Sequence, residues 1–91
     1  MYNTVVMTDK LEILKKRLIY RASYRGTKEM DILLSSFVKK HINVFNDDQL
    51  KSLEKFLNYD DEIIYNFYNY NEIKKNIDKN SISKIFKKFK V

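Results

Sequence analysis

The chain has 91 residues, a net charge of +6, one glycine, no proline and no cysteine. This length allows one domain, and its content of 44% hydrophobic and 14% aromatic residues is too apolar for a disordered chain. The absence of cysteine excludes a disulfide scaffold, a thiol nucleophile and any cysteine-based metal site. Because β-rich domains need turn residues at many strand ends, the scarcity of glycine and proline predicts an all-α fold.

The positive charge is unevenly distributed along the chain. Residues 1–71 carry a net charge of +1, and residues 72–91 carry +5. A nucleic-acid-binding domain is expected to carry its basic patch on the folded body, so the nearly neutral body argues against a nucleic-acid partner. No apolar run approaches the roughly 20 residues that span a bilayer, and residues 1–7 lack the pattern of a secretory signal. We therefore expect a cytoplasmic protein without a transmembrane segment.

The first predicted helix follows a flexible N-terminus, residues 1–8. Asp9 and Glu12 have the spacing of a capping box, in which side chains satisfy free backbone N–H groups at a helix start. Apolar residues then recur at helical spacing, at Leu11, Leu14 and Leu18. The pattern predicts an amphipathic helix that ends near Ser23.

Gly26 separates this helix from a second, more strongly periodic one. Glu29 and Asp31 follow within two turns, where acidic side chains suit the positive end of a helix. Inward positions then repeat at spacings of three and four, at Met30, Leu33, Leu34, Phe37, Val38 and His41. This is the clearest amphipathic pattern in the chain, and it predicts a helix from about residue 29 to residue 41.

Capping and apolar spacing predict three more short helices. Asn46 and Gln49 form a second capping-box pattern, which precedes the inward positions Leu50, Leu53 and Leu57. A polar break at residues 58–61 precedes a fourth helix with the inward positions Ile63, Ile64 and Phe67. Ile73 and Ile77 indicate a fifth helix after the break at residues 69–71.

The last residues form a separate amphipathic element. Residues 81–91 place Ile82, Ile85, Phe86 and Phe89 on one helical face and lysines elsewhere. We expect this face to pack on the bundle or on a partner, in preference to a membrane surface. The predicted division is a flexible N-terminus at residues 1–8, a helical domain at 9–79 and a basic amphipathic tail at 80–91. The predicted fold is a compact bundle of about five short helices with this basic C-terminal tail.

The sequence contains no catalytic constellation. His41 is the only histidine, and its inward register predicts a packed or half-buried side chain. The acidic groups at residues 47–48 and 60–62 stand where helices begin, and capping explains them. The aromatic cluster between residues 59 and 70 lacks the interleaved basic residues of a base-stacking platform, so it indicates packing. We therefore expect a binding protein rather than an enzyme, with no metal site.

Arginine is confined to one part of the chain. Arg17, Arg21 and Arg25 are the only three arginines and recur every four residues, so on a continuous helix they would lie along one stripe. The planar guanidinium group suits bidentate binding. Residues 25–31 add a bare backbone and two carboxylates within about two turns, which predicts a polar docking surface. The alternative interpretation is a solvated basic face of the first helix.

These residues resemble the signature of the succinate dehydrogenase assembly factor 2 family. The core of that signature is R-G-x-x-E, often extended to R-G-x-x-E-x-D. The matching stretch is Arg17-Leu18-Ile19-Tyr20, Arg21-Ala22-Ser23-Tyr24 and Arg25-Gly26-Thr27-Lys28-Glu29-Met30-Asp31. The similarity covers roughly residues 11–77, although the tryptophan and proline that the family often has in its later helices are absent here.

The resemblance implies an assembly factor. Such a protein binds the flavoprotein subunit of succinate dehydrogenase and promotes covalent attachment of FAD to a histidine of that subunit. The FAD then belongs to the partner, and this chain binds no cofactor stably. A fumarate-reductase-like flavoprotein is a second possible client. By position, the contact surface would consist of Arg25, Gly26, Glu29 and Asp31, flanked by Arg17, Tyr20 and Arg21.

The main alternative is a small helical nucleic-acid-binding or antitoxin-like regulatory protein. The lysines of the tail support it, and the neutral body speaks against it. Salt-sensitive binding to duplex DNA would favour this alternative, because phosphate contacts release counterions.

Overall fold

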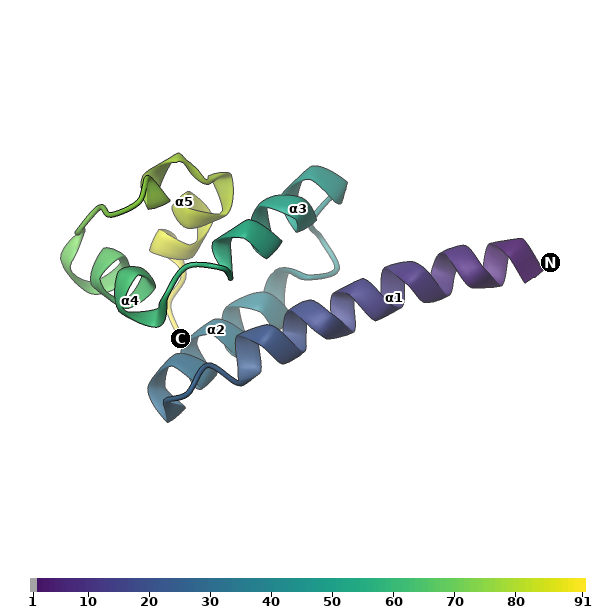
Figure 1. The fold of residues 1–91 in the computed structure, drawn as a ribbon, viewed down its shortest axis with the longest axis horizontal. Helices are drawn as coiled ribbons and strands as arrows, with labels where there is room; N and C mark the ends of the chain where they lie inside the picture. The colour runs from purple at the N-terminus through teal and green to yellow at the C-terminus, as the bar shows by residue number, and fades with distance from the viewer. Residues whose placement is uncertain (1) are drawn as a thin grey trace.

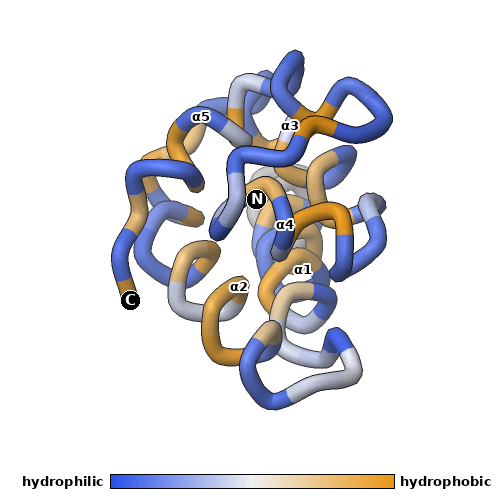
Figure 2. Tube along the Cα trace, turned by 90° about the vertical axis from the view of Figure 1, so that its left-hand side faces the viewer, coloured by the Kyte–Doolittle hydropathy of each residue, from blue (hydrophilic) through white to orange (hydrophobic). Residues whose placement is uncertain are grey.

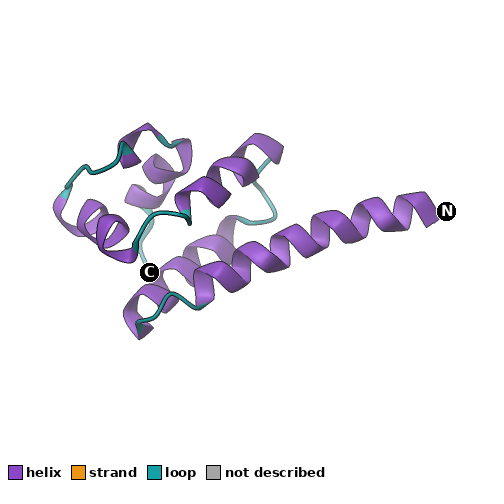
Figure 3. Cartoon of the chain, viewed as in Figure 1, coloured by secondary structure: helices purple, strands orange, loops and turns teal. Residues whose placement is uncertain are grey.

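The computed structural model describes the backbone of residues 2–91 and the side chains from Lys10 onward. Within these residues every regular element is helical, which confirms the all-α prediction (Figure 3). The elements are α1 (Tyr2–Ser23), α2 (Lys28–His41), α3 (Asp47–Phe56), α4 (Asp61–Tyr70), the 3-10 turn η1 (Ile77–Lys79) and α5 (Ser81–Lys88). None of the helices in this part of the chain is both long enough and apolar enough to cross a membrane.

Helices α1 and α2 form an antiparallel pair, and α3 to α5 gather on one side of it (Figure 1). The buried residues Leu18 and Ala22 attach the C-terminal half of α1 to the core. The N-terminal half projects away from the other helices (Figure 1), and Leu11 there is 40% exposed. The helix ends at Ser23 as predicted, but it begins at Tyr2, before the expected start at Asp9. The predicted capping role of Asp9 and the flexibility of residues 1–8 lie outside the described side chains.

Helix α2 has the apolar face that its sequence predicts. Met30, Leu33, Leu34, Phe37 and Val38 are all buried. Thr27 caps the start of the helix, because its hydroxyl accepts a hydrogen bond from the Met30 N–H at 3.2 Å. Figure 2 shows apolar stretches on the helices and mainly hydrophilic connections between them.

The capping box of α3 is confirmed. The Asn46 N–H donates to Gln49 Oε1 at 2.9 Å, and the Gln49 N–H donates to Asn46 Oδ1 at 2.8 Å. Two backbone donors at the helix start are therefore satisfied by side chains. Leu50 and Leu53 face the core from this helix.

The predicted fifth helix around Ile73 and Ile77 is wrong. Ile73 lies in an irregular segment and is 58% exposed, whereas Ile77 is buried within the short turn η1. Asn71, Lys75 and Asn76 all have positive φ angles, between 53° and 59°. A right-handed helix cannot pass through left-handed residues, so α4 ends at Tyr70 and the chain turns back.

Residues 81–91 are part of the helical core and do not form a separate tail. Ile82, Phe86 and Phe89 are buried. The Phe86 ring lies 5.1 Å from the Phe37 ring, 5.2 Å from the Phe56 ring and 4.8 Å from the Tyr68 ring, measured between centroids. The apolar face of α5 thus packs on the bundle, as one of the two preferred expectations stated. This face is therefore not available to a lipid surface.

Candidate functional site

The connection between α1 and α2, residues 24–27, is held against the connection between α3 and α4. We call residues 24–27 the arginine corner. The Arg25 Nε donates to Asp61 Oδ1 at 2.7 Å, Nη1 donates to the Leu57 carbonyl at 2.8 Å, and Nη2 donates to the Tyr59 carbonyl at 2.8 Å. The Arg25 side chain is only 11% exposed. One guanidinium group therefore fastens the first helical pair to the second half of the molecule.

Arginine suits this position because α3 ends beside it. The last carbonyl groups of a helix lack partners within the helix, and the Leu57 carbonyl lies at that end. A guanidinium group has donors pointing in several fixed directions, whereas a lysine ammonium group is a single point of charge. Asp61 stands in the first turn of α4, where the positive end of the helix also favours its carboxylate.

Gly26 gives the corner its shape. Its φ angle is +116°, a conformation that other residues rarely adopt, and an added Cβ would meet no atom within 4 Å. The glycine is therefore required by the backbone conformation and not by crowding within the chain. Gly26 is also exposed, so the space in front of it is open.

Two further residues of the predicted site also contact the chain itself. The carboxylate of Asp31 accepts a hydrogen bond from the backbone N–H of Arg25, and Arg21 Nη2 donates to Asn58 Oδ1. Two arginines, Arg21 and Arg25, thus contact the segment between α3 and α4, and Asp31 binds the backbone of Arg25. The sequence did not indicate Asp61 or Asn58 as their partners.

Other predicted site residues face solvent. Arg17 and Glu29 are exposed, and Tyr20 is 64% exposed. Two exposed apolar side chains that the prediction missed lie in the same segments, Tyr24 on the corner and Ile32 on α2. The Tyr20 and Tyr24 rings lie 4.6 Å apart between centroids. Exposed aromatic residues at a spacing of four beside the motif were the signal that could have identified Tyr24.

Glu29 also lies close to α4. Its negative charge is the largest cause that raises the pKa of Tyr65 above the ordinary value, followed by Tyr70 and by burial. Glu29, Ile32 and Tyr65 line a shallow groove of about 270 Å³ between α2 and α4. This groove, which has the Glu29 side chain and several apolar side chains in its walls, thus begins two residues after the arginine corner in the sequence.

His41 is confirmed as a half-buried, packed residue. Its Nδ1 lies 2.9 Å from the Phe37 carbonyl oxygen, and its ring stacks on Phe45 at 5.4 Å between centroids. Among the side chains that the structure describes, no three residues of the types His, Cys, Asp and Glu gather as a metal site would require.

Comparison with known families identifies the class of protein. The family model described as "Flavinator of succinate dehydrogenase" matches residues 16–90. The chain belongs to this family. The matched range contains the whole arginine corner and all of α5, in agreement with the packing of α5 in the core. This finding confirms the family that the R-G-x-x-E segment indicated.

Several curated proteins are similar to part of the chain. The succinate dehydrogenase assembly factor 2-B, mitochondrial, of Drosophila simulans is 44% identical over 50 residues, which cover 55% of this chain and 32% of that protein. The succinate dehydrogenase assembly factor 2, mitochondrial, of Scheffersomyces stipitis is 40% identical over 57 residues, covering 63% and 38%. The matches thus span between about a third and two fifths of the relatives' length. No solved structure matches the chain.

Proposed function

We propose that this member of the flavinator family binds the flavoprotein subunit of succinate dehydrogenase and promotes the covalent attachment of FAD to that subunit. Family membership and the names of the relatives support the proposal. The observation that carries it in this chain is the arginine corner. Arg25 fixes the corner from the inside, and the exposed Gly26 leaves open space in front of it.

The geometry divides the proposed site residues into two groups. The first group faces solvent and is proposed to contact the flavoprotein; it consists of Gly26, Glu29, Tyr20 and Arg17. Arg25, Asp31 and Arg21 bind groups of their own chain, so they act as positioning residues. This assignment changes the sequence-based proposal, in which Arg25 and Asp31 were themselves contact residues.

The proposed mechanism depends on binding and not on turnover by this chain. FAD supplies the reactive flavin ring, and the histidine that receives it belongs to the partner. The chain would favour the arrangement of the flavoprotein in which these two groups meet. It does so only to the extent that it binds this arrangement more tightly than the others. The chain itself is accordingly proposed to hold no cofactor stably and to perform no catalytic step.

The client and the compartment are also proposals. A fumarate-reductase-like flavoprotein carries the same kind of flavin chemistry and is proposed as a second client. The relatives are named as mitochondrial proteins, whereas the sequence predicted a cytoplasmic protein. For this chain the cytoplasmic location stays a prediction.

A reconstitution experiment tests the proposed function. The flavoprotein subunit from the same organism is prepared without its flavin and incubated with FAD, with and without this chain. Covalent flavin is then measured by fluorescence of the denatured subunit in a gel. We expect the chain to associate with the subunit and to raise the yield of covalent flavin. Equal yields without the chain, together with no association, would refute the proposal.

A further inference from the structure

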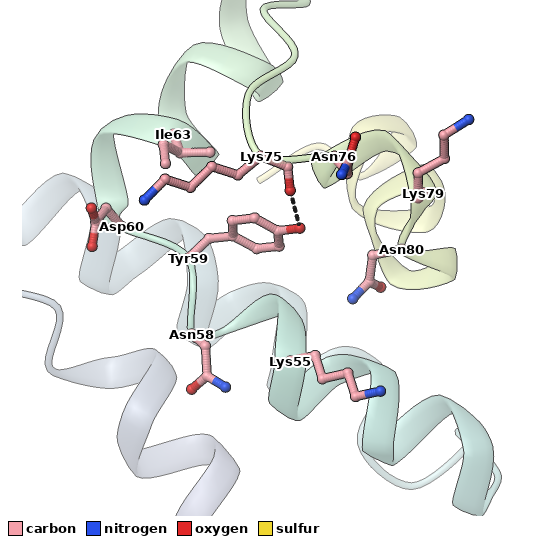
Figure 4. A pocket seen from close by; sticks show the side chains of 9 residues that line it. All are labelled: Lys55, Asn58, Tyr59, Asp60, Ile63, Lys75, Asn76, Lys79 and Asn80. Atoms are coloured by element: carbon pink, nitrogen blue, oxygen red, sulfur yellow. Dashed lines mark hydrogen bonds between the residues drawn. The ribbon is translucent and has the colours of Figure 1, made fainter.

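A hollow beside the α3–α4 connection adjoins the shallow cleft at Arg25. Its volume is about 530 Å³, within the range of small-molecule sites. Three lysines from three different segments line it: Lys55 from α3, Lys75 from the loop after α4, and Lys79 from η1. Figure 4 shows the three lysine side chains extending in different directions around the ring of Tyr59.

The hollow has an excess of positive charge. Asp60 is the only acidic residue that lines it, so lysines outnumber acidic residues three to one in the lining. None of the three lysines forms an ion pair with a side chain that the structure describes. The three lysines and one carboxylate give the lining a net charge of +2, which would attract an anion into the hollow.

Neutral hydrogen-bond donors accompany the lysines. Asn58 and Asn76 both line the hollow. Because Asn58 Oδ1 already accepts a hydrogen bond from Arg21, its NH₂ group is oriented as a donor. A third amide, Asn80, is used structurally, since its Nδ2 donates to the Ser52 carbonyl at 2.9 Å. The wall thus offers the Asn58 NH₂ group, which the contact with Arg21 orients, beside the flexible lysines.

The loop that carries Lys75 and Asn76 is held in a costly conformation. Both residues have positive φ angles, 53° and 59°. Asparagine tolerates this left-handed conformation, but it costs an ordinary residue such as Lys75 about 1–2 kcal/mol. The Tyr59 hydroxyl donates to the Lys75 carbonyl at 2.8 Å and fastens the loop (Figure 4). Backbone strain of this kind is concentrated at ligand-binding sites.

We propose that this hollow binds a compact polyanion of the phosphate class, such as a diphosphate group. Lysine is a common phosphate ligand, and a ligand with several negative charges matches three ammonium groups better than a single carboxylate does. The inference does not rest on the proposed function. The residues Asn58, Tyr59 and Asp60 line both this hollow and the shallow cleft beside Arg25, so the bound anion would lie next to the arginine corner.

A second basic hollow provides a matched control. It has a volume of about 470 Å³ and is lined by Lys40, Lys84, Lys88 and Lys90, with no acidic residue. Its lysines come only from α2 and from α5 and the residues after it, and no asparagine lines it. General attraction of anions to lysine would favour this more positive hollow, whereas the proposal assigns the ligand to the hollow around Tyr59.

The test is a titration of the full chain with inorganic diphosphate at constant ionic strength, followed by ¹H–¹⁵N NMR. Saturable shifts centred on residues 55–60 and 75–79 are expected. The triple variant Lys55→Gln, Lys75→Gln, Lys79→Gln should weaken binding about tenfold or more. The control variant Lys40→Gln, Lys84→Gln, Lys88→Gln removes the same charge and should weaken it less than about threefold. A parallel titration uses ADP. Tighter binding of ADP than of inorganic diphosphate would identify a nucleotide diphosphate as the ligand, and equal binding of the two would identify the free diphosphate group.

A milder variant guards against a folding defect in the triple variant. Asn76→Gly keeps the left-handed backbone accessible and removes only the amide, so it should weaken diphosphate binding about threefold without unfolding the chain. The proposal is overturned by non-saturable shifts, or by equal losses of affinity in the two triple variants.

Discussion

Arg25 and Asp61 form an ion pair, with 2.7 Å between Nε and Oδ1, although they are 36 residues apart in the sequence. The pair joins the arginine corner to the first turn of α4. Both side chains are mostly shielded from water, with 11% and 26% exposure. The pair therefore sets the position of Gly26, the neighbour of Arg25, relative to the second half of the molecule.

Loss of this ion pair should destabilise the protein. Asp61→Ala leaves the shielded guanidinium group without its charged partner, and the expected loss is about 2 kcal/mol of the free energy of unfolding. Urea denaturation measures this value. Asp61→Asn keeps a hydrogen-bond acceptor and should lose less. If Asp61→Ala were as stable as the wild type, the ion pair would have no structural role.

Arg25→Lys tests whether the shape of the guanidinium group matters in addition to its charge. A lysine cannot reach Asp61 and the Leu57 and Tyr59 carbonyls in the same geometry, so we expect a loss of about 1–3 kcal/mol in urea denaturation. Arg17→Lys is the matched control, because Arg17 is exposed. It should change stability by less than about 0.5 kcal/mol. Equal stability of the two variants would contradict the inward role of Arg25.

Two substitutions of Gly26 separate the effect of backbone strain from the effect of side-chain size. Gly26→Ala and Gly26→Arg both place a side chain on a residue with a φ angle of +116°, so each should lose about 1–3 kcal/mol of stability. Only arginine fills the open space in front of the corner. We expect Gly26→Arg to bind the flavoprotein at least about tenfold more weakly than Gly26→Ala. Equal affinities, measured on the folded fraction, would exclude close approach at this glycine.

Local patterns predicted those parts of the fold that depend on neighbours within a few residues. The Asn46–Gln49 capping box and the buried face of α2 depend on spacings of three and four residues, and both are confirmed. The helix predicted at Ile73 was wrong because the chain adopts left-handed conformations at Asn71, Lys75 and Asn76. Glycine is the usual sequence signal for such conformations, and none of these residues is a glycine. Helical spacing showed that Phe86 faces inward, but it could not show which surface covers it.

The candidate site shows the same limit. The R-G-x-x-E segment identified the family and the place of the corner. It could not show that Arg25 turns inward, because its partner Asp61 lies in another helix and looked like a capping residue of α4. Contacts between distant segments are decided by packing, so inward and outward members of the motif could be separated only in the structure.

Glu29 should contribute to partner binding and to the pKa of Tyr65, but little to stability. It is exposed and forms no ion pair with a described side chain, so Glu29→Ala should lose less than about 1 kcal/mol of stability while lowering affinity for the flavoprotein. The opposite ranking would indicate a structural role for Glu29.

The same carboxylate gives a pH-dependent signal. Because Glu29 is the first cause of the raised pKa of Tyr65, Glu29→Gln should lower that pKa, as measured by NMR of the tyrosine ring. A raised pKa means that the folded chain keeps a proton which the unfolded chain loses near its ordinary pKa of 10.0. Stability from this group is thus present below that pH and is lost as the pH rises through the folded pKa. The variant should show a smaller loss, and an unchanged pKa would mean that Glu29 does not act on Tyr65.

Phe86 tests whether α5 is an integral part of the fold. Its side chain is fully buried against Phe37, Phe56 and Tyr68, so Phe86→Ala should cost about 3–5 kcal/mol. A domain of this size has about 5–15 kcal/mol of total stability, and the variant should therefore be largely unfolded at moderate urea concentrations. Lys84→Ala, an exposed position on the same helix, is the control and should change stability by less than about 0.5 kcal/mol. Similar urea midpoints for the two variants would mean that residues 81–91 are separate from the core, as in the predicted division into a domain at 9–79 and a tail at 80–91.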